Sequence, residues 1–497
     1  MEKREASLLP AFTLMQRAGL SVARLSLALA PHAKCIWIAC GPGNNGGDGF
    51  QAAMHLHQWG KKVTVTCVEP GAKGLPKDAA AARQNAVAAG VQFATQPPQD
   101  FDFCVDALLG LGGAGTLCDG RAGTQLMLDW LELMRSSAAP CLAVDLPSGL
   151  DCDTGVLSRA LDAIDKGAAR ARFYSQKALF TLSLLSLKPG LFTADGRDAS
   201  GQVWFDDLQV SSQGEPPSAY LLGSDRAAPT GRSSARHDSH KGVFGDVAVV
   251  GGLSTGSSHM VGAGLLAARA ALNAGAGRVF VALLGQGSIG VDPVQPELMF
   301  RSVDALDLAH CTVVCGCGGG SAVQAVLPAI LSTAPRLVLD ADALNAIAAD
   351  PALAQLLKAR SRCNFLTVLT PHPLEAARLL GTTTTQVQLD RPAAAHQLAA
   401  AFGSVVVLKG SGTVVAAPRQ TSCINYSGNA MLATAGTGDV LGGMVGAQLA
   451  QLAHSASGVT AFDAACTAVF KHGQLADDWL KEQQGLNLTA SRLVAAL

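Results

Sequence analysis

Short apolar runs of strand length alternate with helix-length segments along most of this 497-residue chain. The strand-like runs include CIWIAC (35–40), VTVTCVE (63–69), FDFCVDALLG (101–110), CLAVDLPSG (141–149), GDVAVVGG (245–252), CTVVCGCG (311–318) and VVVLKG (405–410). Because neighbouring parallel strands need a crossover connection, usually a helix, this alternation predicts βαβ units and mostly parallel sheets. The 54 glycines and the aromatic content of only 5% agree, since small side chains let helices pack closely on a sheet. The expected fold class is therefore α/β.

The amino-acid composition of the sequence changes between residues 211 and 240. This stretch is rich in Ser, Pro, Gly and Arg and shows little hydrophobic periodicity, which is typical of an interdomain linker. We expect a first domain over residues 1–215, a linker over 216–240 and a second domain over 241–497.

The charge balance excludes several classes of partner. Lys and Arg number 37 against 38 Asp and Glu, so no basic field is available to attract nucleic acid or anionic lipid. No uncharged apolar run of 18 residues occurs, and the apolar stretch 12–30 is interrupted by Arg17 and Arg24, so we expect an amphipathic helix there and no membrane span. We expect small-molecule ligands and a homo-oligomer.

Thirteen cysteines are scattered as single residues. Cys311, Cys315 and Cys317 come closest to a cluster, but no pair of CxxC motifs is present. We interpret them as buried thiols of a protein of the reducing cytoplasm, in preference to a zinc site.

A glycine-rich loop in the first half, GPGNNGGDG (41–49), follows a strand and opens a helix. It contains the pattern G-x-G-x-x-G, which favours dinucleotide binding, and its Asn and Asp side chains add oxygens that could hold a hard cation. Asp106, Asp145 and Ser148 follow two later strands. Ligands of open α/β sheets bind over the carboxyl ends of the strands, so these side chains predict one shared site. The alternative is that each Asp merely caps the next helix.

These residues resemble a known family. NNGGDG, VDALLG and VDLPSGLD, with LMQRAG (14–19) before and LKPGL (187–191) after them, are similar to the NAD(P)H-hydrate epimerase domain over about residues 1–215, which implies a Rossmann-like three-layer sandwich. The resemblance implies K⁺ ligands at Asn45, Asp106 and Ser148, and Asp145 as the candidate acid or base. It also implies contacts to the hydrated dinucleotide from Asn44, Asn45, Gly46, Gly47, Asp48, Gly110, Gly112, Thr116 and Asp145.

The most specific motif of the second half is ATAGTGDVLGGMVGA (433–447), in which Gly436, Thr437 and Gly438 precede Asp439 at a predicted helix start. Glycine N–H groups at a helix N-terminus suit a transferring phosphoryl group, and the carboxylate could accept a proton from an attacking hydroxyl. The alternative is an acidic residue that only complements the helix dipole. Lys409 and the turn after it could hold nucleotide phosphates.

With TPHPLE (370–375) and VLKGSGT (407–413), this motif resembles the NAD(P)H-hydrate dehydratase domain, a ribokinase-like fold. The resemblance implies ADP as phosphoryl donor, with Mg²⁺, and Asp439 as catalytic base. It implies contacts to the hydrated cofactor from Ala263, Gly318, His372 and Asp439, and to the nucleotide from Lys409, Gly410, Ser411, Gly412, Thr413 and Gly438. Cys317 stands where the family usually has proline.

The tandem predicts an enzyme that repairs hydrated NADH and NADPH: epimerisation in the first domain and ADP-dependent dehydration of the S epimer in the second. Three alternatives stay open. One is a ribokinase-like kinase of a vitamin precursor fused to a non-catalytic binding domain. Another is a scaffolding role of the first half. A third is an NAD oxidoreductase, for which no hydride-transfer partner is evident.

Overall fold

The computed structural model describes residues 4, 7–71, 74–112, 117, 123–161, 178–212, 214–227, 240–255, 259–285, 289–452, 458–483 and 485–497. The chain divides into two compact units, Met1–Pro216 and Pro217–Leu497. Each unit is built on a sheet of its own, so the α/β class expected from the alternation of strands and helices is confirmed.

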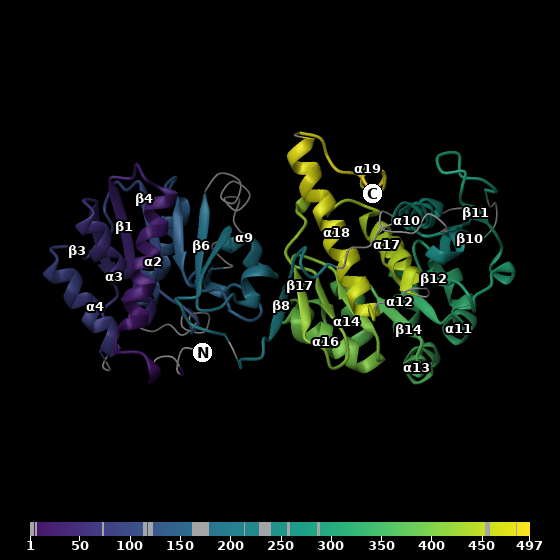
Figure 1. The fold of residues 1–497 in the computed structure, drawn as a ribbon, viewed down its shortest axis with the longest axis horizontal. Coiled ribbons are helices and arrows are strands. Elements are labelled where there is room, and N and C mark those ends of the chain that lie inside the picture. The colour runs from purple at the N-terminus through teal and green to yellow at the C-terminus, as the bar shows by residue number, and fades with distance from the viewer. Residues whose placement is uncertain are drawn as a thin grey trace. The chain divides into compact units, whose positions relative to one another are not determined.

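The first unit contains a seven-stranded parallel sheet with the order β3-β2-β1-β4-β5-β6-β7 (Figure 1). This is the doubly wound order, and it reverses direction between β1 and β4. The strands are β1 (Cys35–Cys40), β2 (Lys62–Cys67), β3 (Gln92–Ala94), β4 (Phe103–Ala107), β5 (Cys141–Val144), β6 (Leu179–Leu184) and β7 (Gln202–Asp206). The main helices are α2 (Thr13–Leu29), α3 (Asn44–Gln58), α4 (Lys77–Ala88), α6 (Thr124–Ser136) and α9 (Gly196–Ser200).

Alternate residues of β1 enter two different cores. Ile36 and Ile38 pack with α2, α3 and α4 on one face, whereas Trp37 packs with α6 on the other. Successive strand residues point to opposite faces, so a strand that is apolar throughout is buried on both sides. This arrangement explains why CIWIAC shows no alternation of polar and apolar residues.

The second unit contains a ten-stranded sheet with the order β11-β10-β9-β12-β13-β14-β15-β16-β17-β8. Its strands are parallel except β16, which is antiparallel to both of its neighbours. The strands are β8 (Ala219–Leu222), β9 (Asp246–Ser254), β10 (Arg278–Gly285), β11 (Met299–Phe300), β12 (Thr312–Cys315), β13 (Arg336–Leu339), β14 (Leu366–Leu369), β15 (Val405–Leu408), β16 (Val414–Ala416) and β17 (Ser422–Asn425).

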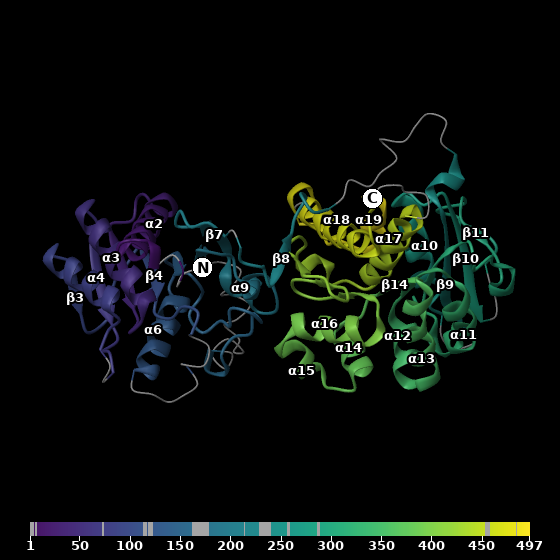
Figure 2. The same ribbon diagram turned by 60° about the horizontal axis from the view of Figure 1, so that its bottom comes forward.

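Helices cover both faces of this sheet (Figure 2). One face carries α10 (Val261–Asn273), α17 (Thr437–Leu452), α18 (Ala461–Glu482) and α19 (Ala490–Ala495). The other carries α11 (Val323–Thr333), α12 (Ala341–Ala349), α13 (Pro351–Arg360), α14 (Pro373–Leu380), α15 (Thr384–Leu389) and α16 (Arg391–Phe402). The result is a three-layer α/β/α unit.

The stretch expected as a linker differs in one respect. Residues 219–222 form β8, which pairs in parallel with β17 and so belongs to the second unit. The sequence AYLL was too short to stand out within a Ser- and Pro-rich segment, and only the free edge of β17 gives it a partner. Within the described residues, no helix is both long and apolar enough to span a membrane.

Candidate functional site

A large pocket of the first unit lies where the strand order reverses, between the carboxyl ends of β1 and β4. Its volume is about 800 Å³, and it is lined by residues that follow β1, β4, β5 and β6 and by part of α2. Of the residues predicted to bind the dinucleotide, the pocket wall includes Asn44, Asn45, Asp48, Gly110, Gly112 and Asp145. Thr116 lies outside the described residues. The structure therefore brings most of the predicted set together at the position that the fold favours for ligands.

Gly46 and Gly47, expected among the dinucleotide contacts, are closely packed by protein atoms, and their contact with the dinucleotide stays a prediction. A Cβ on Gly46 would lie 2.0 Å from the carbonyl oxygen of Gly41, and one on Gly47 would lie 2.7 Å from the Met15 side chain. These glycines let the start of α3 pack closely against the loop before it and against α2. Close packing therefore accounts for glycine at both positions.

Asp106 and Ser148, predicted to bind a cation with Asn45, are held together behind the pocket wall. The Ser148 hydroxyl donates to Asp106 Oδ1 at 2.6 Å, and the Ser148 N–H donates to Oδ2 at 2.9 Å. The Leu109 N–H in turn donates to the Ser148 hydroxyl at 2.9 Å. Burial raises the pKa of Asp106, although these hydrogen bonds act in the opposite direction.

Asn45 completes this region from α3. Its amide lies beside Gly110, where a Cβ would be 3.5 Å from Asn45 Oδ1. Asn45 Nδ2 is buried and has no hydrogen-bond partner in the described structure. A buried amide left unsatisfied is costly, so this atom points to a ligand that is part of the functional state.

Asp145 is positioned by a residue for which the sequence predicted no role, Lys188. The two side chains form an ion pair, and they are only 14% and 8% exposed. Lys188 Nζ also donates to the Leu184 carbonyl at 2.7 Å. Asp145 has a φ of 67°, a backbone conformation that costs energy for a non-glycine residue and is concentrated at functional sites. Lys188 also lines the pocket, so carboxylate and ammonium face the same ligand space.

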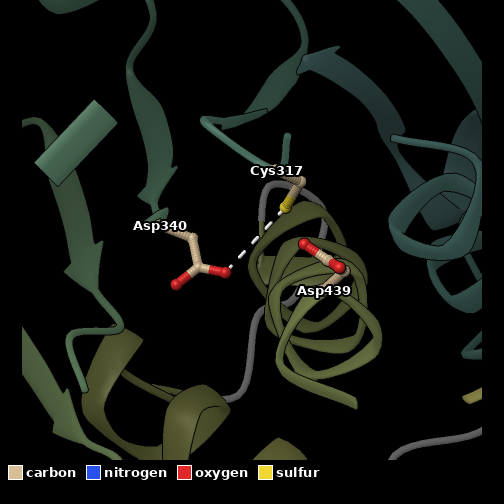
Figure 3. Close-up of side chains that lie close together, drawn as sticks. All are labelled: Cys317, Asp340 and Asp439. Carbon is tan, nitrogen blue, oxygen red and sulfur yellow. Dashed lines mark hydrogen bonds between the residues drawn. The ribbon is translucent and has the colours of Figure 1, made fainter. Parts of the chain in front are cut away.

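In the second unit, three side chains from separate segments converge where β12 and β13 end and α17 begins. Cys317, Asp340 and Asp439 have ligand atoms that all lie within 4.8 Å of one another (Figure 3). Cys317 Sγ is 4.0 Å from Asp340 Oδ2. Cys317 and Asp340 are buried, and Asp439 is partly buried. Asp439, the predicted base, thus lies in a strongly acidic environment.

Lys409 lies in the same cluster but does not present a free ammonium. Its Nζ contacts Asp340 Oδ1 at 2.7 Å, and the Thr370 hydroxyl donates to the same oxygen at 2.8 Å. Burial alone would lower the pKa of Lys409, but the charges of Asp340 and Glu375 outweigh it, so the pKa is raised and the ammonium stays protonated. The partner of Lys409 in the described structure is thus a carboxylate, and its binding of phosphate stays a prediction.

The electrostatic environment of Asp439 favours the protonated form of its carboxyl group. Burial, reinforced by the negative charge of Asp340, raises the pKa of Asp439 to about 7. A general base works best when its pKa lies near the working pH. An Asp that only complemented a helix dipole would have a lowered pKa instead.

The start of α17 is anchored from α18. His472 Nε2 lies 2.9 Å from the Thr437 carbonyl, and burial lowers the pKa of His472 to about 4. Since a carbonyl only accepts, Nε2 carries the proton of the neutral ring. Thr437 also donates its hydroxyl to the Thr434 carbonyl at 2.9 Å. These contacts fix the Gly436–Gly438 loop next to Lys409, whose Nζ would lie 3.4 Å from a Cβ on Gly438.

A buried arginine, Arg391, holds the turn after β15 through hydrogen bonds to its backbone. Arg391 donates to the carbonyls of Leu408 and Lys409, each at 3.2 Å, and would contact a Cβ on Gly410 at 2.8 Å. The Thr413 hydroxyl donates back to the Gly410 carbonyl at 3.2 Å, which closes the turn. The predicted nucleotide residues Gly410, Ser411, Gly412 and Thr413 are thus brought together in one turn.

His372 of the TPHPLE motif has a structural role at the start of α14. Its Nδ1 accepts hydrogen bonds from the N–H groups of Leu374 and Glu375, which caps α14. Its Nε2 lies 3.2 Å from Glu375 Oε1, and the side chain is 46% exposed, so its contact with the hydrated cofactor stays a prediction. Ala263 and Gly318 touch each other, since a Cβ on Gly318 would lie 2.8 Å from that of Ala263.

Several supporting residues had no predicted role, namely Lys188, Asp340, Arg391 and His472. Asp340 was the most accessible to sequence reasoning, because it follows an apolar strand in VLDADALN. Lys188 and His472 act through partners 43 and 35 residues away, and no local pattern indicates such pairs.

Taken together, the fold and its sites define a two-unit α/β protein: a doubly wound unit with a pocket at the point where its strand order reverses, followed by a three-layer unit with a buried acidic cluster at its strand ends. Comparison with known proteins agrees. The family model described as NAD(P)H-hydrate dehydratase matches residues 249–497, and the model described as YjeF-related protein N-terminus matches residues 11–190.

The chain belongs to the family of bifunctional NAD(P)H-hydrate repair enzymes. It is 34% identical over 478 residues to the bifunctional NAD(P)H-hydrate repair enzyme Nnr of Escherichia coli (strain K12), with 94% of this chain and 85% of that protein covered. It is 46% identical over 257 residues to the ADP-dependent (S)-NAD(P)H-hydrate dehydratase of Neisseria meningitidis serogroup B, with 50% and 81% covered. The crystal structure of the ADP/ATP-dependent NAD(P)H-hydrate dehydratase from Bacillus subtilis, co-crystallised with ATP/Mg²⁺, is 27% identical and covers 56% of this chain and 96% of that chain at a TM-score of 0.45.

The expected pair of activities, an epimerase and an ADP-dependent dehydratase, is confirmed at the level of the family. The vitamin-precursor kinase alternative is less well supported, because the two relatives described above are named a bifunctional NAD(P)H-hydrate repair enzyme and an NAD(P)H-hydrate dehydratase.

Proposed function

We propose that the second unit dehydrates the S epimer of hydrated NADH or NADPH with Asp439 as the base and ADP as the phosphoryl donor. The observation that carries this proposal is a carboxylate with a pKa of about 7 in the first turn of α17, next to the Gly436–Gly438 loop. The family assignment supports the substrate and the donor.

The reaction proceeds through an activated leaving group, because hydroxide leaves poorly. Asp439 accepts the proton of the C6 hydroxyl while the hydroxyl oxygen attacks the terminal phosphoryl group of ADP, and AMP leaves. The N–H groups at the start of α17 stabilise the charge of the transferring group. Phosphate then leaves C6, a proton is lost from the neighbouring carbon, and the reduced nicotinamide ring re-forms.

The Lys409–Asp340 pair has a double effect in this scheme. The Asp340 charge helps to raise the pKa of Asp439, and the Lys409 ammonium lies beside Gly438, where the phosphoryl group would be held. A ligand phosphate that approaches Lys409 competes with Asp340 for the ammonium. We propose that nucleotide binding shares Lys409 between the two anions, while the turn of Gly410–Thr413 supplies backbone donors.

We propose that the first unit interconverts the two epimers in the 800 Å³ pocket. The ring nitrogen can expel the C6 hydroxyl, and water can then return to either face. Asp145 and Lys188 form a carboxylate–ammonium pair on the pocket wall that can give a proton to the leaving hydroxyl and take one from the entering water. The N-terminus of α3 at Asn44 offers N–H groups to the pyrophosphate.

The donor set near Asp106 fits a potassium ion. Carboxylate, hydroxyl and amide oxygens suit a hard cation, and Asn45 Oδ1 lies next to Gly110. A cation would offset the buried charge of Asp106. We propose that K⁺ is held by Asp106, Ser148 and Asn45 and stabilises the loop that follows β4.

The acidic cluster of the second unit fits Mg²⁺ poorly. Asp340 Oδ1 is already held by Lys409 and Thr370, and the Cys317 thiol is not a ligand that Mg²⁺ prefers. We therefore propose that Mg²⁺ reaches this unit on the phosphates of ADP rather than on a protein site. We also propose a cytoplasmic location, consistent with the free thiols of the described cysteines, and a homo-oligomer, which light scattering would test.

The proposal is tested with purified hydrated NADH. The S epimer with ADP should regenerate NADH, measured by its absorbance, and omission of ADP should abolish the reaction. The R epimer should be consumed at a rate set by the first unit. Absence of ADP-dependent NADH recovery from the pure S epimer would refute the assignment of the second unit, and failure to equilibrate the epimers would refute that of the first.

A further inference from the structure

In the second unit, one thiol and two carboxylates lie close together. The proposed reaction uses both carboxylates but gives the thiol no role. We propose that Cys317, Asp340 and Asp439 form a binding site for a thiophilic divalent cation such as Zn²⁺, and that its occupancy switches off the dehydratase. Metal binding itself is independent of the proposed function, and only the inhibition rests on it.

The geometry is close to that of a three-ligand metal site. The ligand atoms lie within 4.8 Å of one another, and Cys317 Sγ is 4.0 Å from Asp340 Oδ2. Around tetrahedral zinc, with bonds of about 2.0–2.3 Å, neighbouring ligand atoms are about 3.5 Å apart. The thiol and the Asp340 carboxylate therefore need to approach by about 0.5 Å, and a pair at the 4.8 Å limit by about 1.3 Å, for all three groups to bind one ion. Figure 3 shows the three groups pointing toward a common centre.

The contacts of Asp340 with Lys409 and Thr370 leave its Oδ2 available to a metal ion. Oδ1 accepts from Lys409 and Thr370, whereas Oδ2 faces Cys317 and has only the long thiol contact in the described structure. Asp340 is 2% exposed, so Oδ2 is a buried carboxylate oxygen without a strong donor. Such an atom gains more from a cation than an exposed one would.

The charge of the cluster favours a divalent ion. When the metal displaces the thiol proton, the thiolate and two carboxylates face a single ammonium, that of Lys409. The bound cation offsets this negative charge at the same time as it displaces the proton. Sulfur selects zinc and similar ions over Mg²⁺, so the cellular excess of Mg²⁺ does not fill the site.

The consequence for catalysis follows from the identity of the third ligand. Asp439 cannot accept a proton while one of its oxygens holds the metal. The two carboxylate partners of Cys317 lie 23 and 122 positions further along the chain, so no zinc motif is visible in the sequence. Only the fold brings the three residues together.

The probe is Co²⁺, which reports a thiolate ligand through a thiolate-to-cobalt absorption band. The metal-free full-length protein should bind one Co²⁺ per chain with this band, and Zn²⁺ should abolish the band by displacement. Cys317→Ala should lose the band and bind Zn²⁺ at least tenfold more weakly. Cys315→Ala is the matched control, since Cys315 is equally buried two residues earlier in β12 and should leave both properties unchanged.

Zn²⁺ should also inhibit ADP-dependent dehydration by the unmodified protein and the Cys315→Ala variant at concentrations at least tenfold below those needed for Cys317→Ala, relative to each metal-free rate. The proposal is overturned if the unmodified protein shows no thiolate-to-cobalt band, if Cys317→Ala keeps the band, or if the Cys315→Ala control loses it equally. The spectroscopic result stands whether or not the protein dehydrates the S epimer, so failure of the metal site and failure of the proposed function are distinguishable.

Discussion

Replacing Asp439 by asparagine should destroy dehydration and at the same time stabilise the protein. The carboxyl has an ordinary pKa of 3.8 and one of about 7 in the folded state. A raised pKa means that the folded state favours the protonated carboxyl. This contribution to stability is complete below the unfolded pKa and is lost as the pH rises through about 7.

The magnitude follows from the size of the shift. About three pKa units correspond to at most about 4 kcal/mol of destabilisation at pH 8, at about 1.4 kcal/mol per unit. Asp439→Asn removes this cost and loses a favourable helix-dipole interaction of about 0.3–1 kcal/mol. The variant should therefore have a higher Tm at pH 8, and the gain should shrink at pH 5, where the folded carboxyl of the unmodified protein is largely protonated.

The activity should change in the opposite direction. General-base catalysis is worth about 10²–10⁴-fold, so NADH recovery from the S epimer with ADP should slow by roughly that factor. In the unmodified protein kcat/KM should rise with pH and level off above about 7, and the variant should lack this limb. ADP binding, measured by calorimetry, should persist because the backbone donors are untouched.

The matched control is Asp304→Asn, which neutralises an exposed carboxylate of the same unit and should change neither rate nor Tm. A variant that dehydrates at nearly the unmodified rate would refute the role of Asp439 as base. A lower Tm at pH 8 would refute the electrostatic argument, and loss of ADP binding would make Asp439 a structural residue of the helix start.

Three further predictions concern the first unit and the division of the chain. Lys188→Met should slow epimerisation at least tenfold because Asp145 loses its ion-pair partner, and Lys188→Arg should restore part of it, as read from the ratio of epimers over time. Asp106→Ala should weaken epimerisation and abolish its dependence on K⁺, measured by potassium titration. The fragments Met1–Pro216 and Pro217–Leu497 should fold separately and each keep its own activity, whereas a second fragment that begins after β8 should be less stable because the edge of β17 is exposed.

The predictions for Lys188 and Asp106 have a control in the second unit. Dehydration of the pure S epimer should stay unchanged in the Lys188 and Asp106 variants, and equal loss of both activities would point to misfolding rather than to the epimerase site. If Lys188→Arg were as inactive as Lys188→Met, a positive charge at this position would not be sufficient for epimerisation. Insoluble fragments from a stable full chain would show that the two units need each other.

The local elements were largely predictable from the sequence. Apolar runs such as CIWIAC predicted strands, and the glycine-rich loops predicted helix starts at the carboxyl ends of those strands. The order of these elements along the chain was enough to predict an α/β protein with two units. The acidic residue of GTGD was also predictable, because its position at a helix start follows from local pattern alone.

The tertiary structure alone decided how charges combine in space. Lys188 pairs with Asp145, and Asp340 lies between Cys317 and Lys409, because strand order brings the ends of distant strands to one edge of each sheet. It also decided which glycines are packed against neighbouring segments. Residues 219–222 became a strand only because β17 offered an open edge. Periodicity reports the environment of a residue relative to its neighbours in sequence, whereas pKa values, ion pairs and metal sites depend on contacts between segments that are far apart in the chain.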